Sequence, residues 1–401
     1  MRCLICEDKL LDDTLDVGEH PVSSFLRDDP TAPEARVALA LGQCGRCGVI
    51  QLRQPVSYEK LVPPAFIAAR EPEEHLDEVV EKILETFELG PESIVAGLTY
   101  KDDTTLERFE RKGVKRTWRA HLSDFEIDNP AANIETVQIR TTPERMAAVA
   151  AKYGQADLLI VRHISEHTED PAAFMQGLAA LVKPGGLLML EIPDCTKNLT
   201  LRDYCMIWEE HSLYLTPATY EMLPPLGGFE SQYIDVHPLP FENCLVQIAR
   251  KTGAPRTPTP SDAAASEIGL LGDYARGFAP ACADLRRQLE SMREKHGKIA
   301  LFGAGHLACA FVNFMGVADL IEFVADDTPE KQGRYLPGSD LLIAPSSNLL
   351  TEGIAVCLLA LSISNEDKVI ARNQAFVDAG GRFLSIFRAS TRSIFDADYP
   401  T

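Results

Sequence analysis

The 401-residue sequence lacks any apolar run of about 18 residues, the length that a membrane-spanning helix needs, so we expect no membrane partner. Its first ten residues, MRCLICEDKL, reach charged side chains too early to contain the apolar region of a signal peptide. Basic residues are also scarce, because 39 Lys and Arg face 59 Asp and Glu, for a formal net charge of -20. Nucleic-acid binding needs a basic surface, so we expect no nucleic-acid partner. The lack of a membrane-spanning run and of a signal-peptide region leads us to expect a cytoplasmic location.

The chain is too long for one ordinary core, and its residue pattern divides it into three parts. Residues 1–70 are rich in turns and cysteines, whereas apolar strand-like runs alternate with helical stretches in residues 71–254. We interpret residues 252–265, rich in Pro, Thr and Ala, as a linker, after which a second alternation runs through residues 255–401. Alternating strands and helices predict an α/β protein with mostly parallel sheets, in which a small N-terminal module precedes two Rossmann-like domains.

Two CxxC pairs stand in the N-terminal part, Cys3 with Cys6 and Cys44 with Cys47. Each pair can place two thiolates on one tetrahedral ion, and four thiolates are typical of structural zinc. The alternative is four unrelated buried cysteines, but the paired spacing favours one structural zinc ion. We expect the remaining cysteines to pack mostly in the core: Cys195, Cys205, Cys244, Cys282, Cys309 and Cys357.

Several segments resemble the nucleotide-sugar C-methyltransferases, in the family's order and over nearly the whole chain. They are CLIC, DVGEHPVSSFL, QCGRCGVIQL, ADLLIVRHISEHTEDP, LVKPGGLLMLEIPD, EEHSLYLTPAT, GAGHLACAFVNF and PEKQGRYLPGS. The resemblance implies a zinc-binding module at 1–70, a methyltransferase-like domain at 71–254 and a C-terminal domain at 255–401. These enzymes act on 4-keto deoxysugars, so it also implies a nucleotide-linked sugar as partner and S-adenosylmethionine as methyl donor.

The resemblance also implies a reaction and its residues. In the family a histidine removes the proton beside the sugar's ketone, and the resulting carbanion takes the methyl group. The matching base is His211, beside Glu210 as an orienting carboxylate, and His167 is a possible acid or enolate stabiliser. An imidazole with a pKa near 6.5 can accept a proton at neutral pH, although each histidine could instead be structural.

The methyl-donor pocket departs from the family pattern. Aligning TTLERF with the start of the family's helix puts Thr99 and Asp103 where glycines belong. His121 stands where an acid should hold the ribose, and Asp124 follows about three positions later. The candidate cofactor-binding residues are Gly97, Thr99, Asp102 and His163.

Two tyrosines of the family's active site are also replaced, and Phe66 and Trp208 are the matching candidates for substrate binding. Neither carries a phenol hydroxyl that could hydrogen-bond an enolate. Three explanations stay open: S-adenosylmethionine binds in an altered pocket, the enzyme epimerises or otherwise isomerises a keto sugar without methylating it, or the chain is a non-catalytic sugar-nucleotide-binding protein.

A glycine turn opens the C-terminal part. Residues 303–308, GAGHLA, fit the dinucleotide fingerprint between a strand and an apolar helix, and Asp326 ends the next strand. The turn could bind NAD, could contact the sugar nucleotide or its phosphates, or could serve strand–helix packing alone. His306 is a candidate phosphate contact, and Arg334 and Tyr335 in KQGRYLPG are further candidates for substrate binding, with a solvated loop as the alternative.

Overall fold

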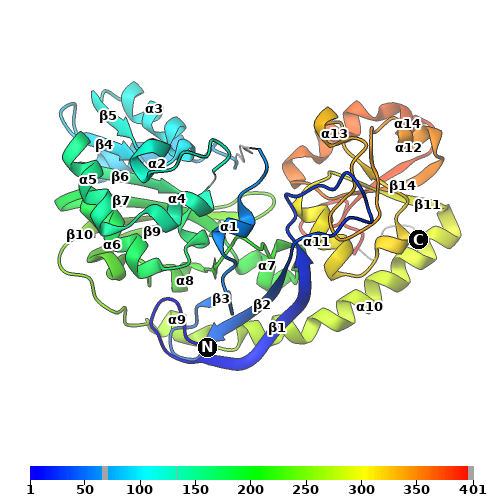
Figure 1. Ribbon diagram of the computed structural model, residues 1–401, viewed down its shortest axis with the longest axis horizontal. Helices are drawn as coiled ribbons and strands as arrows, with labels where there is room; N and C mark the ends of the chain where they lie inside the picture. Colours follow the sequence, from blue (N-terminus) through cyan, green and yellow to red (C-terminus); the bar gives the residue numbers. More distant parts are fainter. Residues whose placement is uncertain (66–70, 133, 396–401) are drawn as a thin grey trace. The chain divides into compact units, whose positions relative to one another are not determined.

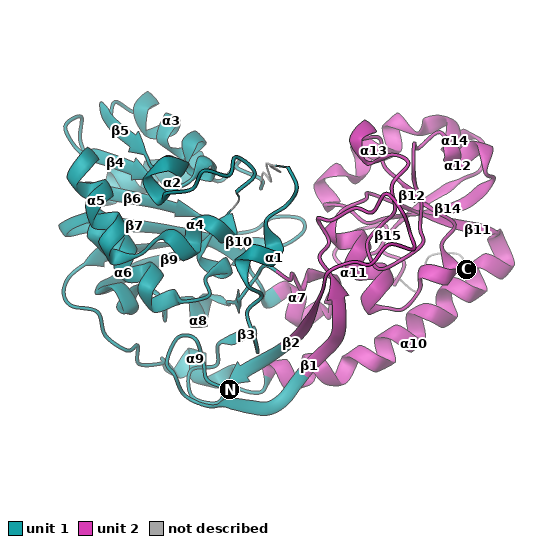
Figure 2. Cartoon of the chain, in the orientation of Figure 1, with its two compact units in different colours: residues 1–14, 41–196, 210–269 teal, residues 15–40, 197–209, 270–401 magenta. Residues whose placement is uncertain are grey.

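The computed structural model describes residues 1–65, 71–132 and 134–395, and the chain forms two compact units (Figures 1 and 2). Unit 1 contains residues 1–14, 41–196 and 210–269. Unit 2 contains residues 15–40, 197–209 and 270–401. Each unit is thus built from three separate stretches of chain, and the predicted boundaries near residues 70 and 254 stay a prediction.

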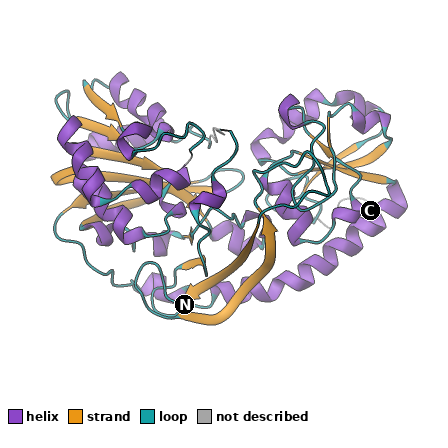
Figure 3. Ribbon diagram, in the orientation of Figure 1, coloured by secondary structure: helices purple, strands orange, loops and turns teal. Residues whose placement is uncertain are grey.

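Unit 1 is built on a six-stranded mixed sheet with the order β5-β4-β6-β7-β10-β9. Figure 3 shows the strands of the chain in orange and its helices in purple. The strands of this sheet are β4 (Ile94–Gly97), β5 (Arg116–Arg119), β6 (Ala156–Arg162), β7 (Val182–Asp194), β9 (Phe229–His237) and β10 (Asn243–Lys251). The first four pair in parallel, and β10 runs antiparallel to both β7 and β9. The carboxyl ends of β4, β6 and β7 therefore lie at one edge of the sheet, where open α/β sheets bind ligands.

Helices cover both faces of this sheet. The helices of unit 1 are α1 (Tyr58–Leu61), α2 (Leu76–Thr86), α3 (Asp103–Arg111), α4 (Ile134–Arg140), α5 (Pro143–Tyr153), α6 (Pro171–Leu181), α8 (Pro217–Tyr220) and α9 (Asp262–Ser266). Alternation along β6 divides the core, because Leu158 and Ile160 pack in the cluster of α2 and α3, whereas Leu159 and Val161 pack in the cluster of α5 and α6. A parallel strand that is covered on both faces has a nearly continuous apolar sequence, which is why the segment ADLLIV could be predicted as a buried strand.

A four-stranded sheet contains the N-terminal cysteines, with the order β1-β2-β3-β8. Its strands are β1 (Leu10–Pro21), β2 (Arg36–Cys44), β3 (Ile50–Leu52) and β8 (Leu213–Tyr214). β3 is antiparallel to both β2 and β8. Strands β1 and β2 both include residues of unit 1 and of unit 2.

Unit 2 is built on a five-stranded parallel sheet with the order β13-β12-β11-β14-β15. The strands are β11 (Lys298–Phe302), β12 (Val324–Ala325), β13 (Ile343–Ala344), β14 (Ile354–Leu359) and β15 (Arg382–Ser385). Its helices are α10 (Leu270–His296), α11 (His306–Phe314), α12 (Asn348–Thr351), α13 (Glu366–Arg372) and α14 (Gln374–Asp378), and α7 (Thr196–Leu201) begins one residue before the unit does.

The predicted α/β class and the strand–helix alternation are confirmed, with two local corrections. The predicted linker is not entirely irregular, because residues 262–266 form α9, which Ser261 caps with its hydroxyl. Strand β9 was not predicted, since its half-buried residues lack a continuous apolar run. In the parts of the chain that the structure describes, no helix combines the length and apolar character that a membrane crossing requires.

Candidate functional site

The four N-terminal cysteines gather into one buried cluster in unit 1. The Sγ atoms of Cys3 and Cys47 lie 3.6 Å apart, those of Cys6 and Cys44 3.5 Å, and those of Cys6 and Cys47 3.6 Å. Four thiolates about 2.3 Å from one tetrahedral ion lie about 3.8 Å from each other, so the cluster has the size of a zinc site. All four positions are protein ligands, as expected for a structural ion, and the cysteines present fit zinc.

Asp102 closes the turn that follows β4. Its Oδ2 accepts hydrogen bonds from the backbone N–H groups of Leu98 and Thr99, each at 2.7 Å, and its Oδ1 accepts one from the N–H of Arg162 at 3.0 Å. A side chain at Gly97 would approach the Asp102 Cβ to 2.8 Å. Burial raises the pKa of Asp102 to about 7. The amides of this turn therefore bind the chain's own carboxyl group, whereas the family's glycine turn lets the backbone approach the methyl donor.

The residues after β5 also have partners of their own. The His121 N–H donates to Asp124 Oδ2 at 2.9 Å, and Asp124 also accepts hydrogen bonds from Lys152 Nζ at 2.7 Å and the Tyr153 hydroxyl at 3.1 Å. The turns after β4 and β5 thus have internal hydrogen-bond partners, and S-adenosylmethionine is the cofactor that the family implies. The roles of Gly97, Thr99, Asp102 and His163 as cofactor contacts stay a prediction.

Ion pairs fill the carboxyl end of β6. Arg162 is 1% exposed, and its guanidinium donates to Glu73 Oε1 at 3.0 Å and lies 3.1 Å from Glu191 Oε1. His163, in the left-handed backbone conformation with φ 49°, places its Nε2 2.9 Å from the same Glu191 oxygen. Arg162 and His163 therefore fix the orientation of the Glu191 carboxylate inside unit 1.

Two of the predicted catalytic histidines meet in unit 1. His167 lies in the short 3-10 helix η3 (Ser165–His167), and its ring is 4.6 Å from that of His211, edge to face. Glu135 of α4 lies 2.8 Å from His167 Nδ1, and Glu166 lies 3.9 Å from its Nε2. Glu210 joins the same group, because ligand atoms of Glu135, His167 and Glu210 lie within 4.8 Å of one another.

The electrostatics of this group favour a charged His167. Burial disfavours the imidazolium, but the hydrogen bond to Glu135 and the charges of Glu135, Glu166 and Glu210 outweigh it and raise the pKa of His167. A carboxylate 2.8 Å from Nδ1 favours a proton on that nitrogen and leaves Nε2 as the one that can exchange a proton with another molecule. The group therefore combines an imidazole of raised pKa, His167, with a second imidazole, His211.

Trp208 and His306, both predicted to bind substrate, meet in unit 2. Their rings stack with centroids 3.7 Å apart and an interplanar angle of 12°. Glu209 Oε2 lies 3.1 Å from His306 Nδ1, while Glu209 Oε1 accepts from the Ser23 hydroxyl at 2.6 Å. Burial opposes ionisation of Glu209, but His306 and Ser23 hold its pKa at about 2. His306 is therefore positioned through its Nδ1 by a buried carboxylate.

Asp326 is occupied by protein contacts beside the C-terminal glycine turn. Its Oδ2 accepts from the Ala304 N–H at 2.8 Å and pairs with Lys331 Nζ at 3.1 Å, and its Oδ1 accepts from the Thr328 N–H at 2.9 Å. Gly303, with φ 103°, is needed because a Cβ there would lie 2.9 Å from the Ala360 carbonyl oxygen. The acid that would bind a dinucleotide's ribose is thus engaged internally, which favours the packing role of this turn over NAD binding.

Arg334 and Tyr335 hold the segment around Arg27. Arg334 Nε donates to Asp28 Oδ1 at 2.8 Å, and its terminal nitrogen donates to the Leu26 carbonyl oxygen at 2.6 Å. The backbones of Tyr335 and Arg27 exchange two hydrogen bonds of 2.7 and 3.0 Å. Both residues therefore have a structural role inside unit 2, and their contact with substrate stays a prediction.

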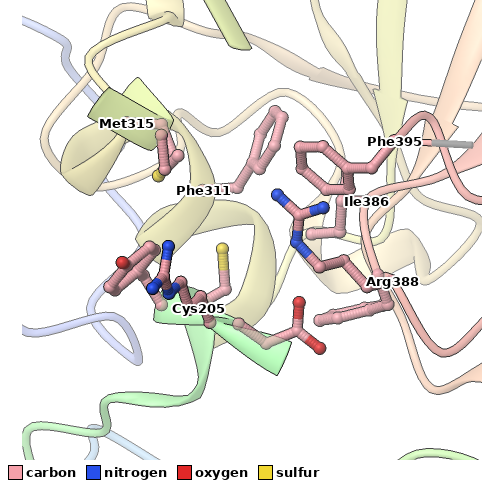
Figure 4. Close-up of a pocket in the computed structure, with 11 residues that line it drawn as sticks. Cys205, Phe311, Met315, Ile386, Arg388 and Phe395 are labelled. Carbon is pink, nitrogen blue, oxygen red and sulfur yellow. The ribbon is translucent and has the colours of Figure 1, made fainter. Parts of the chain in front are cut away.

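A small cavity of about 20 Å³ lies in unit 2 (Figure 4). Cys205, Phe311, Met315, Ile386, Arg388 and Phe395 are among the residues that line it. This volume suits about one water molecule, so the cavity is a packing defect and is too small for a sugar nucleotide. Burial raises the pKa of the Cys205 thiol, in agreement with the predicted packing role of this cysteine.

Sequence reasoning missed several partners of the predicted residues. Glu135 and Glu166 contact His167, and Ser23 and Glu209 contact His306. Glu166 and Glu209 lie in the motifs HISEH and EEH, which were chosen for their histidines. Their presence in these motifs was the sequence signal that could have identified them. Phe66 lies outside the described residues.

Three family profiles match this chain in succession. A zinc binding domain matches residues 3–61, a methyltransferase domain residues 101–223, and a C-methyltransferase C-terminal domain residues 261–387. The N-terminal match contains all four clustered cysteines, the middle match contains His167 and His211, and the last contains His306.

The chain is also similar to individual known proteins. The chain is 25% identical over 403 residues to the C-methyltransferase NovU of Streptomyces niveus, covering 96% of this chain and 94% of NovU. Among solved structures, the 1,6-didemethyltoxoflavin-N1-methyltransferase of Burkholderia thailandensis is 13% identical, with a TM-score of 0.30, over 45% of this chain and 77% of that one. The magnesium protoporphyrin IX methyltransferase of Synechocystis PCC 6803 is 13% identical, with a TM-score of 0.29, over 45% and 79%. The chain therefore belongs to the three-domain C-methyltransferases, with a zinc-binding N-terminal domain, a methyltransferase domain and a C-methyltransferase C-terminal domain.

Proposed function

We propose that this enzyme methylates a carbon beside the ketone of a nucleotide-linked 4-keto deoxysugar, through an enolate. The observation that carries the proposal is the group of His167, His211 and Glu210 with Glu135 and Glu166 in unit 1. S-adenosylmethionine, which the family implies, supplies the methyl group when it is bound. The family resemblance of the sequence supports the choice of substrate class.

In this proposal, His211 breaks the C–H bond beside the ketone by accepting the proton, and the electron pair moves onto the ketone oxygen. Glu210 orients His211. His167, whose pKa is raised, donates a hydrogen bond to the developing oxyanion. Positioned general bases contribute about 10²- to 10⁴-fold to such a step, and a donor aimed at the oxyanion adds a further contribution. The role of Trp208 and His306 in substrate binding stays a prediction.

The test is a panel of nucleotide-linked 4-keto deoxysugars, with nucleotide-linked sugars that lack the ketone as controls. A bound substrate at about 100 times its Kd should stabilise the fold by about 2.7 kcal/mol, seen as a raised melting temperature. With S-adenosylmethionine, mass spectrometry should show a product carrying one methyl group in place of one hydrogen. If no keto sugar stabilises the protein and NAD alone does, the proposal fails.

A second function is favoured by the Asp102 turn, whose amides are engaged by the chain's own carboxyl group. Proton abstraction by His211 followed by proton return to the other face would invert the carbon, which makes the enzyme an epimerase of the same keto sugar. In deuterated water the epimerase should place deuterium beside the ketone without S-adenosylmethionine, and the inverted sugar should accumulate. Methylation that depends on S-adenosylmethionine, without accumulation of the inverted sugar, would exclude this function.

Glu135 is proposed as the positioning residue of His167. The Glu135→Gln variant removes the negative charge at Nδ1, so the pKa of His167 should fall. His167 must be protonated to donate to the oxyanion, and activity is therefore present below its pKa and lost as pH rises through it. The alkaline limb of the pH profile should move to lower pH in the variant.

Nuclear magnetic resonance titration of His167 checks the same shift without any substrate. Glu126→Gln, at an exposed carboxylate that pairs with Arg145, is the matched control and should leave the titration of His167 unchanged. An unaltered His167 titration in Glu135→Gln would show that Glu135 has no such role.

A further inference from the structure

Three buried side chains from separate elements of unit 1 meet in a place that the proposed reaction does not use. His75 directly precedes α2, Glu191 lies in β7 and Cys244 lies in β10. One ligand atom of each lies within 4.8 Å of the other two. The three residues are 7%, 0% and 2% exposed, so the group is closed off from bulk water.

Three polar atoms of this group lack a hydrogen bond in the described part of the chain, whereas Glu191 Oε1 and the Cys244 thiol interact with His163. His75 Nε2 and Glu191 Oε2 lie 3.4 Å apart, yet neither has a hydrogen-bond partner among the described residues, and the same holds for His75 Nδ1. Buried polar atoms are nearly always paired, and an unpaired one calls for an explanation such as an ion. Two ligand atoms about 2 Å from one tetrahedral ion lie about 3.4 Å apart, which matches the observed separation.

Neighbouring residues fix the orientation of the Glu191 carboxylate. Glu191 Oε1 is bound by His163 Nε2 at 2.9 Å and lies 3.1 Å from the Arg162 guanidinium, which leaves Oε2 directed at His75. Metal-binding carboxylates are commonly oriented by such outer hydrogen bonds. We propose that His75, Glu191 and Cys244 bind a divalent transition-metal ion of the zinc type, separate from the ion of the N-terminal cysteines.

The charged groups around the site pair with one another. Glu191 and Glu73 contact Arg162, Glu73 also contacts Arg108, and Glu71 contacts Lys101. The charge of a bound ion would therefore be met by its own ligands, the Glu191 carboxylate and the deprotonated Cys244 thiol.

The donor set selects the class of ion. Imidazole, thiolate and carboxylate together suit zinc and similar transition metals, whereas Mg²⁺ and Ca²⁺ prefer oxygen ligands alone. Three protein ligands leave one tetrahedral position. His237, the last residue of β9, lies beside His75 with ring centroids 4.9 Å apart, and its buried Nε2 has no hydrogen-bond partner in the described part of the chain. His237 is not part of the group whose ligand atoms lie within 4.8 Å of one another, so that position stays open to a non-protein ligand.

Metal counting on the full chain tests the proposal. After saturation with zinc and desalting, inductively coupled plasma mass spectrometry should find two ions per wild-type chain, and one per chain in Cys244→Ala and in His75→Gln. X-ray absorption of Cys244→Ala should then show zinc bound by sulfur alone. In Cys44→Ser the remaining buried ion should show one sulfur at about 2.3 Å and nitrogen or oxygen at about 2.0–2.1 Å.

Cys357→Ala is the matched control, because this cysteine is equally buried but lies in β14 of unit 2. It should keep both ions. Circular dichroism identifies a variant that fails to fold, and the two single variants at different ligands make a shared folding defect easy to recognise. A zinc-saturated wild-type chain that holds only one ion, released by Cys44→Ser, would overturn the proposal.

Discussion

Cys44→Ser is expected to release the ion of the N-terminal cysteines and to unfold the sheet around it. Cys44 ends β2, and its Sγ lies 3.5 Å from that of Cys6, so the substitution removes one of four thiolates from a closed tetrahedral set. Metal binding and folding are coupled in such sites, where binding contributes on the order of 10 kcal/mol. Metal analysis should show one ion fewer per chain, and limited proteolysis should cut faster between residues 1 and 61.

Cys357→Ser serves as the control, since it introduces the same change at a buried cysteine outside the cluster. Its metal content should equal that of the wild type, although its burial will cost some stability. If Cys44→Ser retained full metal content and the wild-type proteolysis pattern, the four cysteines would be ordinary core residues.

His211→Ala is expected to reduce turnover of the keto sugar by about 10²- to 10⁴-fold, the contribution of a positioned general base. Exchange of the proton beside the ketone with deuterated water should fall by the same factor, because both processes share the proton-abstraction step. Substrate affinity should change little, since the imidazole is proposed to act on one proton. Deuterium incorporation, measured by mass spectrometry, reports the proton-abstraction step separately from substrate affinity.

His296→Ala, at the end of α10, is the matched control and should keep wild-type exchange. The melting temperatures of both variants show whether the fold is intact. Exchange at the wild-type rate in a folded His211→Ala would assign the base to another residue, and Glu210→Gln would be the next variant to measure.

Local patterns made the N-terminal cluster and the strands predictable. The spacing of the two CxxC pairs alone predicts how the ligands are arranged, because the short distance within each pair allows two thiolates to bind one ion. The run ADLLIV predicted β6 for a related reason, since burial on both faces favours the continuous apolar stretch LLIV that it contains. Such features depend on residues that are neighbours in the sequence.

The candidate site was only partly predictable, because its residues come from distant segments. His167 and His211 were chosen from motifs, but the contact of their rings depends on how η3 and the segment before β8 pack together. Glu135 had no signal, since a single glutamate in α4 looks like an ordinary surface residue until the fold buries it against His167. Cys244 was predicted to pack in the core, which its burial permits, and only the structure places it with His75 and Glu191.

The interleaving of the two units limits how this enzyme can be divided or recombined. A fragment of residues 255–401 would contain His306 but neither Glu209 nor Ser23, so its imidazole would lose both Nδ1 partners. All residues of unit 1 have been synthesised once the ribosome reaches residue 269. Unit 2 cannot form until the last part of the chain is made and joins the two segments that were synthesised earlier. Exchange of whole C-terminal parts between relatives should therefore succeed only when residues 15–40 and 197–209 are exchanged with them. Recombination of these enzymes thus has to exchange three segments together, whereas a protein of consecutive domains would need to exchange only one.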